Sequence, residues 1–271
     1  MPARDADTPV LTGEHLLARF NALDAFLREH QALWRPRPFT QRQLPWETAH
    51  PGLAAWLRQR TLEDAENSHN HPEQLDAPAP FPALAAEATT LGAVGELPIQ
   101  AIAPAAHRLN VDVPGRKWQQ IEAFAACLRF TDTPRHWLDW CSGKGHLGRR
   151  LLQADQQLTC LEYDPALVSS GQALSQHHHL PALHRQQDVL ADDAAQHLSA
   201  DLTPVALHAC GDLHVRLLQL ASAAGCRQLA VAPCCYNRIH ASHYQALSVA
   251  GQNSTLRLSL DDLALPLSET V

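Results

Sequence analysis

Apolar residues recur at helical spacing near the start of the chain. Between residues 12 and 34, steps of three and four residues place four of them on one helical face: Leu16, Phe20, Leu23 and Leu27. A second helix is predicted over residues 51–65, where Pro51 suits the first turn. A proline-rich flexible segment follows near residues 66–80. We therefore expect a small helical N-terminal region over residues 1–112.

The pattern changes after residue 112. Residues 113–130 carry one more helical stripe, and five short apolar runs then alternate with segments of helix-like composition. These runs are "HWLDW", "QLTCLEY", "ALHRQQDV", "PVALHAC" and "RQLAVAPC". Strands that alternate with helices form parallel sheets through right-handed crossovers. The sequence therefore predicts an α/β domain over residues 113–271, with a mostly parallel sheet and helices on both faces.

Composition limits the possible classes of protein. With 45% apolar residues the chain can bury a core, and its net charge of −7 argues against a broad nucleic-acid-binding surface. No window approaches the roughly 18 apolar residues that span a bilayer, and the N-terminus lacks the apolar stretch of a signal peptide. We expect a cytoplasmic location without membrane contact. The seven cysteines mostly lie inside apolar runs, which predicts reduced thiols.

The stretch "LDWCSGKGHLG", residues 138–148, places a glycine-rich turn between a predicted strand and a predicted helix. Gly143, Gly145 and Gly148 have G-x-G-x-x-G spacing. Glycine lets the backbone turn tightly and approach a ligand closely, and a helix N-terminus offers free N–H groups. This context predicts a cofactor site, with a plain strand-to-helix turn as the alternative.

Acidic residues end three successive predicted strands. Asp139 precedes the turn, where a carboxylate would repel a pyrophosphate and would suit a ligand with a positive end. Glu162 lies 19 residues after Gly143, near the distance at which an acidic side chain meets ribose hydroxyls, and Asp188 is placed to accept from an adenine amino group. Together they predict an S-adenosylmethionine site. For Glu162 and Asp188, ordinary capping or turn residues are the alternative.

The motifs "DWCSGKGHLG", "CLEYD", "QQDVL", "HACGDL" and "APCCYN" resemble those of class I S-adenosylmethionine-dependent methyltransferases. More narrowly, residues 114 to about 240 resemble a methyltransferase-domain family that contains glutathione S-transferase C-terminal-domain-containing proteins and is related to tRNA ribose 2'-O-methyltransferases. The resemblance implies a Rossmann-like class I methyltransferase sheet. It also implies a cofactor site lined by Asp139, Gly143, Gly145, Glu162 and Asp188. The predicted cofactor-binding set further includes Cys141 and Cys210.

The chain departs from these relatives in two ways. The tRNA enzymes carry Cys/His zinc modules before the domain, whereas no cysteine precedes Cys127, so their substrate does not carry over. Their fold has two more strands after the fifth, but only 36 residues follow Cys235. The segment "STLRLSLDDLALPLSETV" could supply one of the two strands. The domain is therefore expected to lack at least one of its last strands.

The motifs "HACGDL" and "PCCYN" should end the fourth and fifth strands beside the sulfonium. His208 and Asp212 are the candidate bases, and Tyr236 could stack on the acceptor. As alternatives, Asp212 caps a helix, Cys210 fills space and "PCCYN" is a packed turn. If the acceptor is RNA, three arginines are possible phosphate contacts: Arg149, Arg150 and Arg238. The first two also suit the exposed side of a helix.

A metal site built from two strand ends is a further possibility, with His208, Cys210, Cys234 and Cys235 as ligands. Adjacent cysteines fit the spacing of structural zinc sites poorly, so no metal is predicted. The predicted function is methyl transfer from S-adenosylmethionine to an unidentified acceptor, with RNA as a candidate. The alternatives are a non-catalytic S-adenosylmethionine-binding or interaction module and a nicotinamide-dependent oxidoreductase, which Asp139 disfavours.

Overall fold

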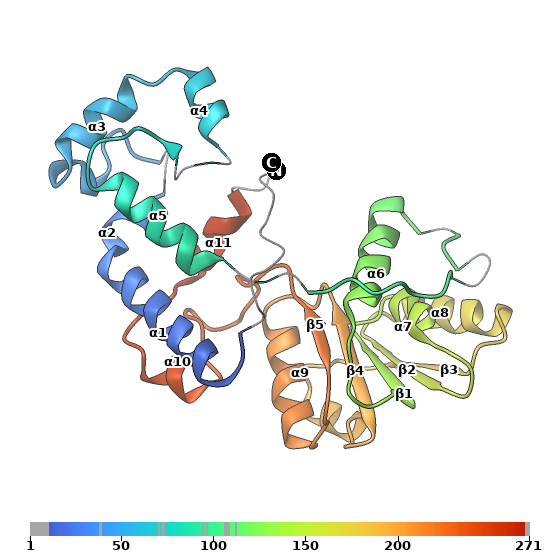
Figure 1. Ribbon diagram of the computed structural model, residues 1–271. Helices are drawn as coiled ribbons and strands as arrows, with labels where there is room; N and C mark the ends of the chain where they lie inside the picture. The colour runs from blue at the N-terminus through green and yellow to red at the C-terminus, as the bar shows by residue number, and fades with distance from the viewer. Residues whose placement is uncertain are drawn as a thin grey trace. The chain divides into compact units, whose positions relative to one another are not determined.

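A computed structural model describes residues 11–268, except 38–39, 70, 72–73, 94, 96, 106–108 and 112. The chain forms two compact units. One comprises Met1–Leu97 with Ser248–Leu258, and the other comprises Pro98–Leu247 with Ser259–Val271. The first unit is helical and the second contains the sheet (Figure 1). The division of the sequence after residue 112 remains a prediction, as does flexibility near residues 66–80, part of which lies outside the described residues.

The first unit contains short helices. They are α1 (Gly13–Glu29), α2 (Gln31–Trp34), α3 (Pro51–Arg58), α4 (Leu62–Ser68), α5 (Phe81–Gly92) and α10 (Val249–Asn253), with the 3₁₀ helix η1 (Pro45–Thr48). Helices α1 and α5 are joined through Arg19, whose guanidinium donates to the carbonyls of Thr90 and Leu91 at the end of α5. Carbonyls in the last turn of a helix have no N–H partner within the helix, and the arginine supplies their hydrogen-bond donors.

The predicted single helix over residues 51–65 is wrong. Helix α3 ends at Arg58, and α4 begins at Leu62 after a break. Thr61 and Asp64 form a capping box there: the Asp64 N–H donates to the Thr61 hydroxyl, and the Thr61 N–H donates to the Asp64 carboxylate. This reciprocal pair satisfies two backbone donors and starts a new helix in place of a continued one.

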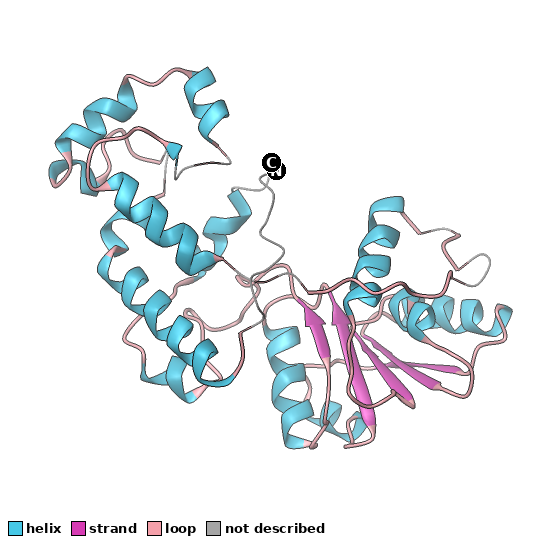
Figure 2. Cartoon of the chain, in the orientation of Figure 1, coloured by secondary structure: helices cyan, strands magenta, loops and turns pink. Residues whose placement is uncertain are grey.

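The second unit is built on a five-stranded parallel sheet (Figure 2). Its strands are β1 (His136–Trp140), β2 (Gln157–Glu162), β3 (Ala182–Gln186), β4 (Leu202–Leu207) and β5 (Ala230–Ala232). The strand order is β3-β2-β1-β4-β5, and every neighbouring pair is parallel. The predicted Rossmann-like parallel sheet is therefore confirmed. Parallel strand ends meet at one edge of the sheet, where the predicted site residues lie in the last positions of β1 and β2 or after the ends of β1, β3, β4 and β5.

Helices cover both faces of this sheet. They are α6 (Gly115–Cys127), α7 (His146–Leu151), α8 (Pro165–His177) and α9 (Asp212–Ala223), with the 3₁₀ helix η3 (Asp192–His197). Side chains of β1 alternate between two cores. Trp137 packs with α6 and α7, whereas Leu138 and Trp140 pack with α9. This alternation carries Asp139 to the same face as α6 and α7.

The last part of the chain does not add a strand to the sheet among the described residues. Ser259 makes a single antiparallel bridge with His243, and α11 (Leu260–Ala264) begins at the next residue. A capping box between Ser259 and Asp262 starts this helix, which the 3₁₀ helix η4 (Leu265–Ser268) follows. The expectation of a strand here is wrong. No helix in the described part of the chain is both long and apolar enough to cross a membrane.

Candidate cofactor site and active site

The glycine-rich turn is attached to the end of strand β2. The Ser142 N–H donates to the carbonyl of Leu161 at 2.9 Å, and the Gly143 N–H donates to the Glu162 carboxylate at 2.8 Å. Cys141, directly after β1, has a positive φ of 56°. The turn therefore leaves the sheet sharply and is held in place by the neighbouring strand.

The three glycines serve different purposes. Gly143 has a φ of +57°, and no atom lies within 4 Å of the position that its Cβ would take. At Gly145 a Cβ would lie 2.6 Å from the His184 ring, and at Gly148 it would lie 2.5 Å from a methyl group of Leu158. Gly145 and Gly148 thus allow the turn to pack on strands β2 and β3. Gly143 is the glycine that leaves room for a ligand.

Asp139 lies beneath the turn and is 2% exposed. Its carboxylate accepts a hydrogen bond from the Gly148 N–H at 2.9 Å. Burial raises the pKa of this carboxyl to about 7, although the Gly148 N–H and the nearby Arg149 and Lys117 favour the ionised form. Asp139 is therefore only partly ionised at neutral pH, and its observed contact is to the backbone that shapes the turn.

This raised pKa makes the protein's stability depend on pH. The folded state holds a proton on Asp139 up to about pH 7, whereas an unfolded chain releases it near pH 4. Stability from this group is full below pH 4 and is lost as the pH rises to 7, by at most about 4 kcal/mol. We expect Asp139→Asn to flatten the pH dependence of the unfolding free energy between pH 4 and 7. Parallel urea titrations of both proteins check this, and equal slopes would contradict it.

Two further predicted cofactor ligands lie at neighbouring strand ends. Glu162 is half-buried, and besides Gly143 it accepts from the Asp164 N–H at 3.0 Å. Asp188 is exposed and accepts from the Leu190 N–H at 3.0 Å. The Gln187 N–H donates to the Glu162 carbonyl at 2.8 Å, which continues the β2–β3 ladder past the strands. The fold thus places Glu162 and Asp188 at the same edge of the sheet as the turn.

His208 follows β4 with a positive φ of 67° and is exposed. Its Nε2 lies 3.0 Å from the side-chain oxygen of Gln120 on α6. Cys141 occupies a similar left-handed conformation after the adjacent strand β1. Such conformations are costly for residues other than glycine, and they cluster at active sites and ligand clamps. Two of the four non-glycine residues with positive φ in the described part of the chain, Cys141 and His208, thus lie at the ends of the neighbouring strands β1 and β4.

Asp212 begins α9 and holds the loop after β5. Its carboxylate accepts from both the backbone N–H and the ring Nδ1 of His240 at 2.8 Å, and its own N–H donates to the Arg238 carbonyl at 3.1 Å. Both His240 contacts fall on the same carboxylate oxygen, and together with the Arg238 contact they tie the loop after β5 to the start of α9. Tyr236 is 48% exposed and meets the ring of His214 edge-on.

The sequence misplaced two of the three arginines proposed as phosphate contacts. Arg149 is 3% exposed, and its guanidinium donates to the carbonyl of Lys144 at 2.5 Å. Arg150 pairs with Glu122 of α6 at 2.5 Å. The expectation that Arg149 lies on an exposed helix face is therefore wrong, and of the three only Arg238 is exposed.

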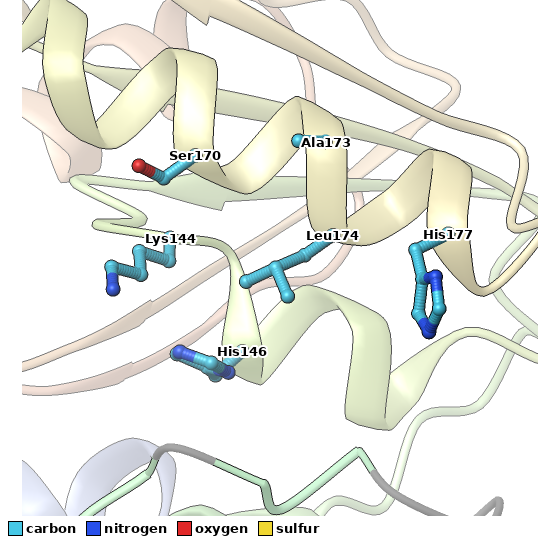
Figure 3. A pocket seen from close by; sticks show the side chains of 6 residues that line it. All are labelled: Lys144, His146, Ser170, Ala173, Leu174 and His177. Carbon is cyan, nitrogen blue, oxygen red and sulfur yellow. The ribbon is translucent and has the colours of Figure 1, made fainter.

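A cavity of about 380 Å³ lies between the glycine turn and α8, and none of the three acidic residues lines it. Figure 3 shows Lys144 and His146 on one side of it and Ser170, Leu174 and His177 of α8 on the other. Burial and the nearby Arg149 lower the pKa of His146 to about 4, so its ring is neutral at pH 7. This cavity could not be predicted from the sequence, because its walls come from separate elements.

Two contacts of candidate catalytic residues also escaped sequence reasoning. Gln120 bonds to His208 across 88 residues, and His240 bonds to Asp212 across 28. The two residues of each pair are too far apart in the sequence to form a recognisable motif. A positive φ at His208, which only a structure reveals, is the signal that points to this contact region.

Residues 116–242 match a family model that is described as a methyltransferase domain. The matched segment includes all five strands and their helices. This part of the chain has a class I methyltransferase fold. The match to the methyltransferase domain agrees with the resemblance seen in its motifs and supports a methyltransferase. No curated protein matches the chain.

Two solved structures are similar to parts of the chain. TehB from Haemophilus influenzae is 12% identical over 34% of this chain and 32% of its own, with a TM-score of 0.29. A protein from Staphylococcus aureus described as a caffeoyl-CoA O-methyltransferase is 10% identical over 60% of this chain and 66% of its own, with a TM-score of 0.30. The chain thus spans about a third of TehB and less than two thirds of the second protein's length.

Proposed function

We propose that this protein transfers a methyl group from S-adenosylmethionine to an acceptor. The observation that carries the proposal is the glycine turn at the carboxyl edge of the sheet. There Gly143 has open space beside it, and its N–H donates a hydrogen bond to the carboxylate of Glu162. The methyltransferase-domain match over the same segment supports it.

The residues at this edge suit such a cofactor, which supplies a methyl group activated by a sulfonium. Gly143 permits close approach, Glu162 can accept from ribose hydroxyls, and Asp188 can accept from an adenine amino group. Both carboxylates keep an oxygen or a lone pair beyond their backbone contacts, since a carboxylate offers about four acceptor positions. Cys141 directly follows β1, and Cys210 lies after the end of the neighbouring strand β4.

His208 is the better candidate base of the two proposed. It is exposed and its ring is positioned by Gln120, whereas the carboxylate of Asp212 is engaged by His240. A base takes the acceptor proton when the nucleophile is weak, and positioning within hydrogen-bond reach is the first requirement. Tyr236 is exposed next to this edge of the sheet and offers a flat surface on which an acceptor can stack.

RNA stays a candidate acceptor on the strength of the resemblance to tRNA methyltransferases. The net charge of −7 and the internal partners of Arg149 and Arg150 leave Arg238 as the exposed member of the proposed phosphate contacts. The narrower family relationship and the cytoplasmic location likewise remain predictions.

Equilibrium dialysis of the full chain with labelled S-adenosylmethionine tests the proposed cofactor. We expect bound label that S-adenosylhomocysteine displaces and that a nicotinamide dinucleotide does not. Displacement by the dinucleotide alone would favour the oxidoreductase and contradict the proposal. Retained cofactor without methyl transfer to RNA, protein or small-molecule acceptors would favour the non-catalytic module.

A further inference from the structure

Three thiols meet where strands β4 and β5 end. The sulfur of Cys210 lies 2.9 Å from that of Cys234, which lies 3.5 Å from that of Cys235. All three sulfur atoms are within 4.8 Å of one another. They are free thiols, and no His, Asp or Glu among the described residues joins this group of ligand atoms.

The parallel register brings the thiols together. Strands β4 and β5 are neighbours (Figure 1), and Leu207 pairs with Ala232 at their ends. The His208 N–H donates to the Ala232 carbonyl at 3.0 Å, which continues the pairing beyond the strands. Cys210 and Cys234 follow within three residues of that pair. Residues 24 positions apart in sequence therefore converge at one point.

The loops that carry the thiols are also fastened to each other. Gly211 has a φ of +54°, and its missing side chain makes room for the Arg238 carbonyl, which would lie 1.8 Å from a Cβ. The Asp212 N–H donates to that carbonyl, and the Asp212 carboxylate holds His240. The two chain segments that flank the sulfurs are thus fixed before any ligand arrives.

We propose that Cys210, Cys234 and Cys235 form a binding site for a thiophilic divalent cation such as Zn²⁺, with a fourth coordination position left for solvent or a small ligand. A tetrahedral ion with metal–sulfur bonds of about 2.3 Å separates its sulfurs by about 3.8 Å. The Cys210–Cys234 and Cys234–Cys235 separations of 2.9 and 3.5 Å are shorter, so binding requires these sulfurs to move apart by less than about 1 Å. Binding replaces three thiol protons, which leave to solvent. The inference goes beyond the proposed methyl transfer and does not depend on it.

This arrangement differs from the one that the sequence disfavoured. Closed structural zinc sites use four ligands and separate their paired cysteines by a few residues. Here an adjacent pair is completed by a third thiol from another strand end, and three protein ligands with one open position are typical of catalytic zinc. Cys234 is exposed and the other two are half-buried, so an ion can enter from solvent.

Cobalt titration of the full chain under reducing conditions tests the site. We expect one equivalent of Co²⁺ to produce the near-ultraviolet thiolate-to-metal absorption, and Zn²⁺ to abolish it. Cys210→Ser and Cys235→Ser should each weaken binding at least about tenfold. Cys226→Ser is the matched control, because Cys226 is half-buried and donates to the Ser199 carbonyl away from the cluster.

Circular dichroism of each variant establishes whether it is folded. If Cys210→Ser does not fold, Cys235→Ser still tests the site. Absence of the absorption in wild type with free thiols would overturn the proposal. So would cluster variants that bind Co²⁺ as tightly as the control does. A disulfide between Cys210 and Cys234 that persists in reductant, detected by mass spectrometry, would overturn it too.

Discussion

Replacing Gly211 with alanine is expected to lower the unfolding free energy of the sheet-containing unit by about 4 kcal/mol, combining backbone strain with overpacking. Gly211 has φ +54° and ψ −125°, a conformation that only glycine adopts without strain. The added Cβ would overlap the Arg238 carbonyl, which belongs to the backbone and cannot rotate away. The variant would have to separate the loops after β4 and β5.

Urea titration followed by hydrogen-exchange mass spectrometry of peptides from β4 and β5 measures this loss. Gly115→Ala is the matched control, because Gly115 lies in the same unit and its added Cβ would meet nothing within 4 Å. Its unfolding free energy should change by less than about 1 kcal/mol. A Gly211→Ala protein as stable as this control would show that the two loops are not packed as described.

Replacing Gly143 with alanine is expected to weaken S-adenosylhomocysteine binding about 10- to 100-fold, or about 1.4 to 2.7 kcal/mol. The methyl group would occupy the open space beside the turn, where the cofactor is proposed to approach. The left-handed backbone at this residue costs alanine about 1 to 2 kcal/mol, so the protein should remain folded. This substitution therefore tests cofactor binding in a protein that is still folded.

Isothermal titration calorimetry with the folded variant checks this result, and Gly115→Ala again serves as the control. Both substitutions add a methyl group at an open position, but only Gly143 lies in the turn. Unchanged affinity in Gly143→Ala would place the cofactor elsewhere, for example in the cavity beside Lys144 and His146.

The parallel sheet could be predicted because its central strands are buried on both sides. Three of the five residues of strand β1 are apolar, and four of the five are buried. The glycine turn could be predicted because its signal is local: the spacing, the preceding strand and the following helix lie within a few residues of one another.

Competing local signals explain two errors. Leu256, Leu258 and Leu260 alternate as in a strand, but the capping pair Ser259 and Asp262 starts a helix instead. In the same way Thr61 and Asp64 interrupt the apolar periodicity of the predicted second helix. In both places the hydrogen bonds of a helix N-terminus prevailed over the apolar pattern.

Tertiary contacts explain the features that could not be predicted from the sequence. An arginine on a helix is usually exposed, yet Arg149 is buried, with carbonyls and His146 as its partners. The thiol cluster depends on the register of β4 and β5, and the anchoring of Asp212 depends on a loop that returns from β5. No spacing within the sequence encodes these distances.

Calorimetric titration of S-adenosylhomocysteine into wild type and Glu162→Gln tests the cofactor site most directly. The substitution keeps an oxygen to accept from the Gly143 N–H, gives up the acceptor of the Asp164 N–H and removes the negative charge proposed to hold the ribose. Micromolar binding by wild type, weakened about tenfold or more in Glu162→Gln, is the predicted result. No heat and no thermal stabilisation with folded wild type, or equal affinity in both proteins, would contradict the account.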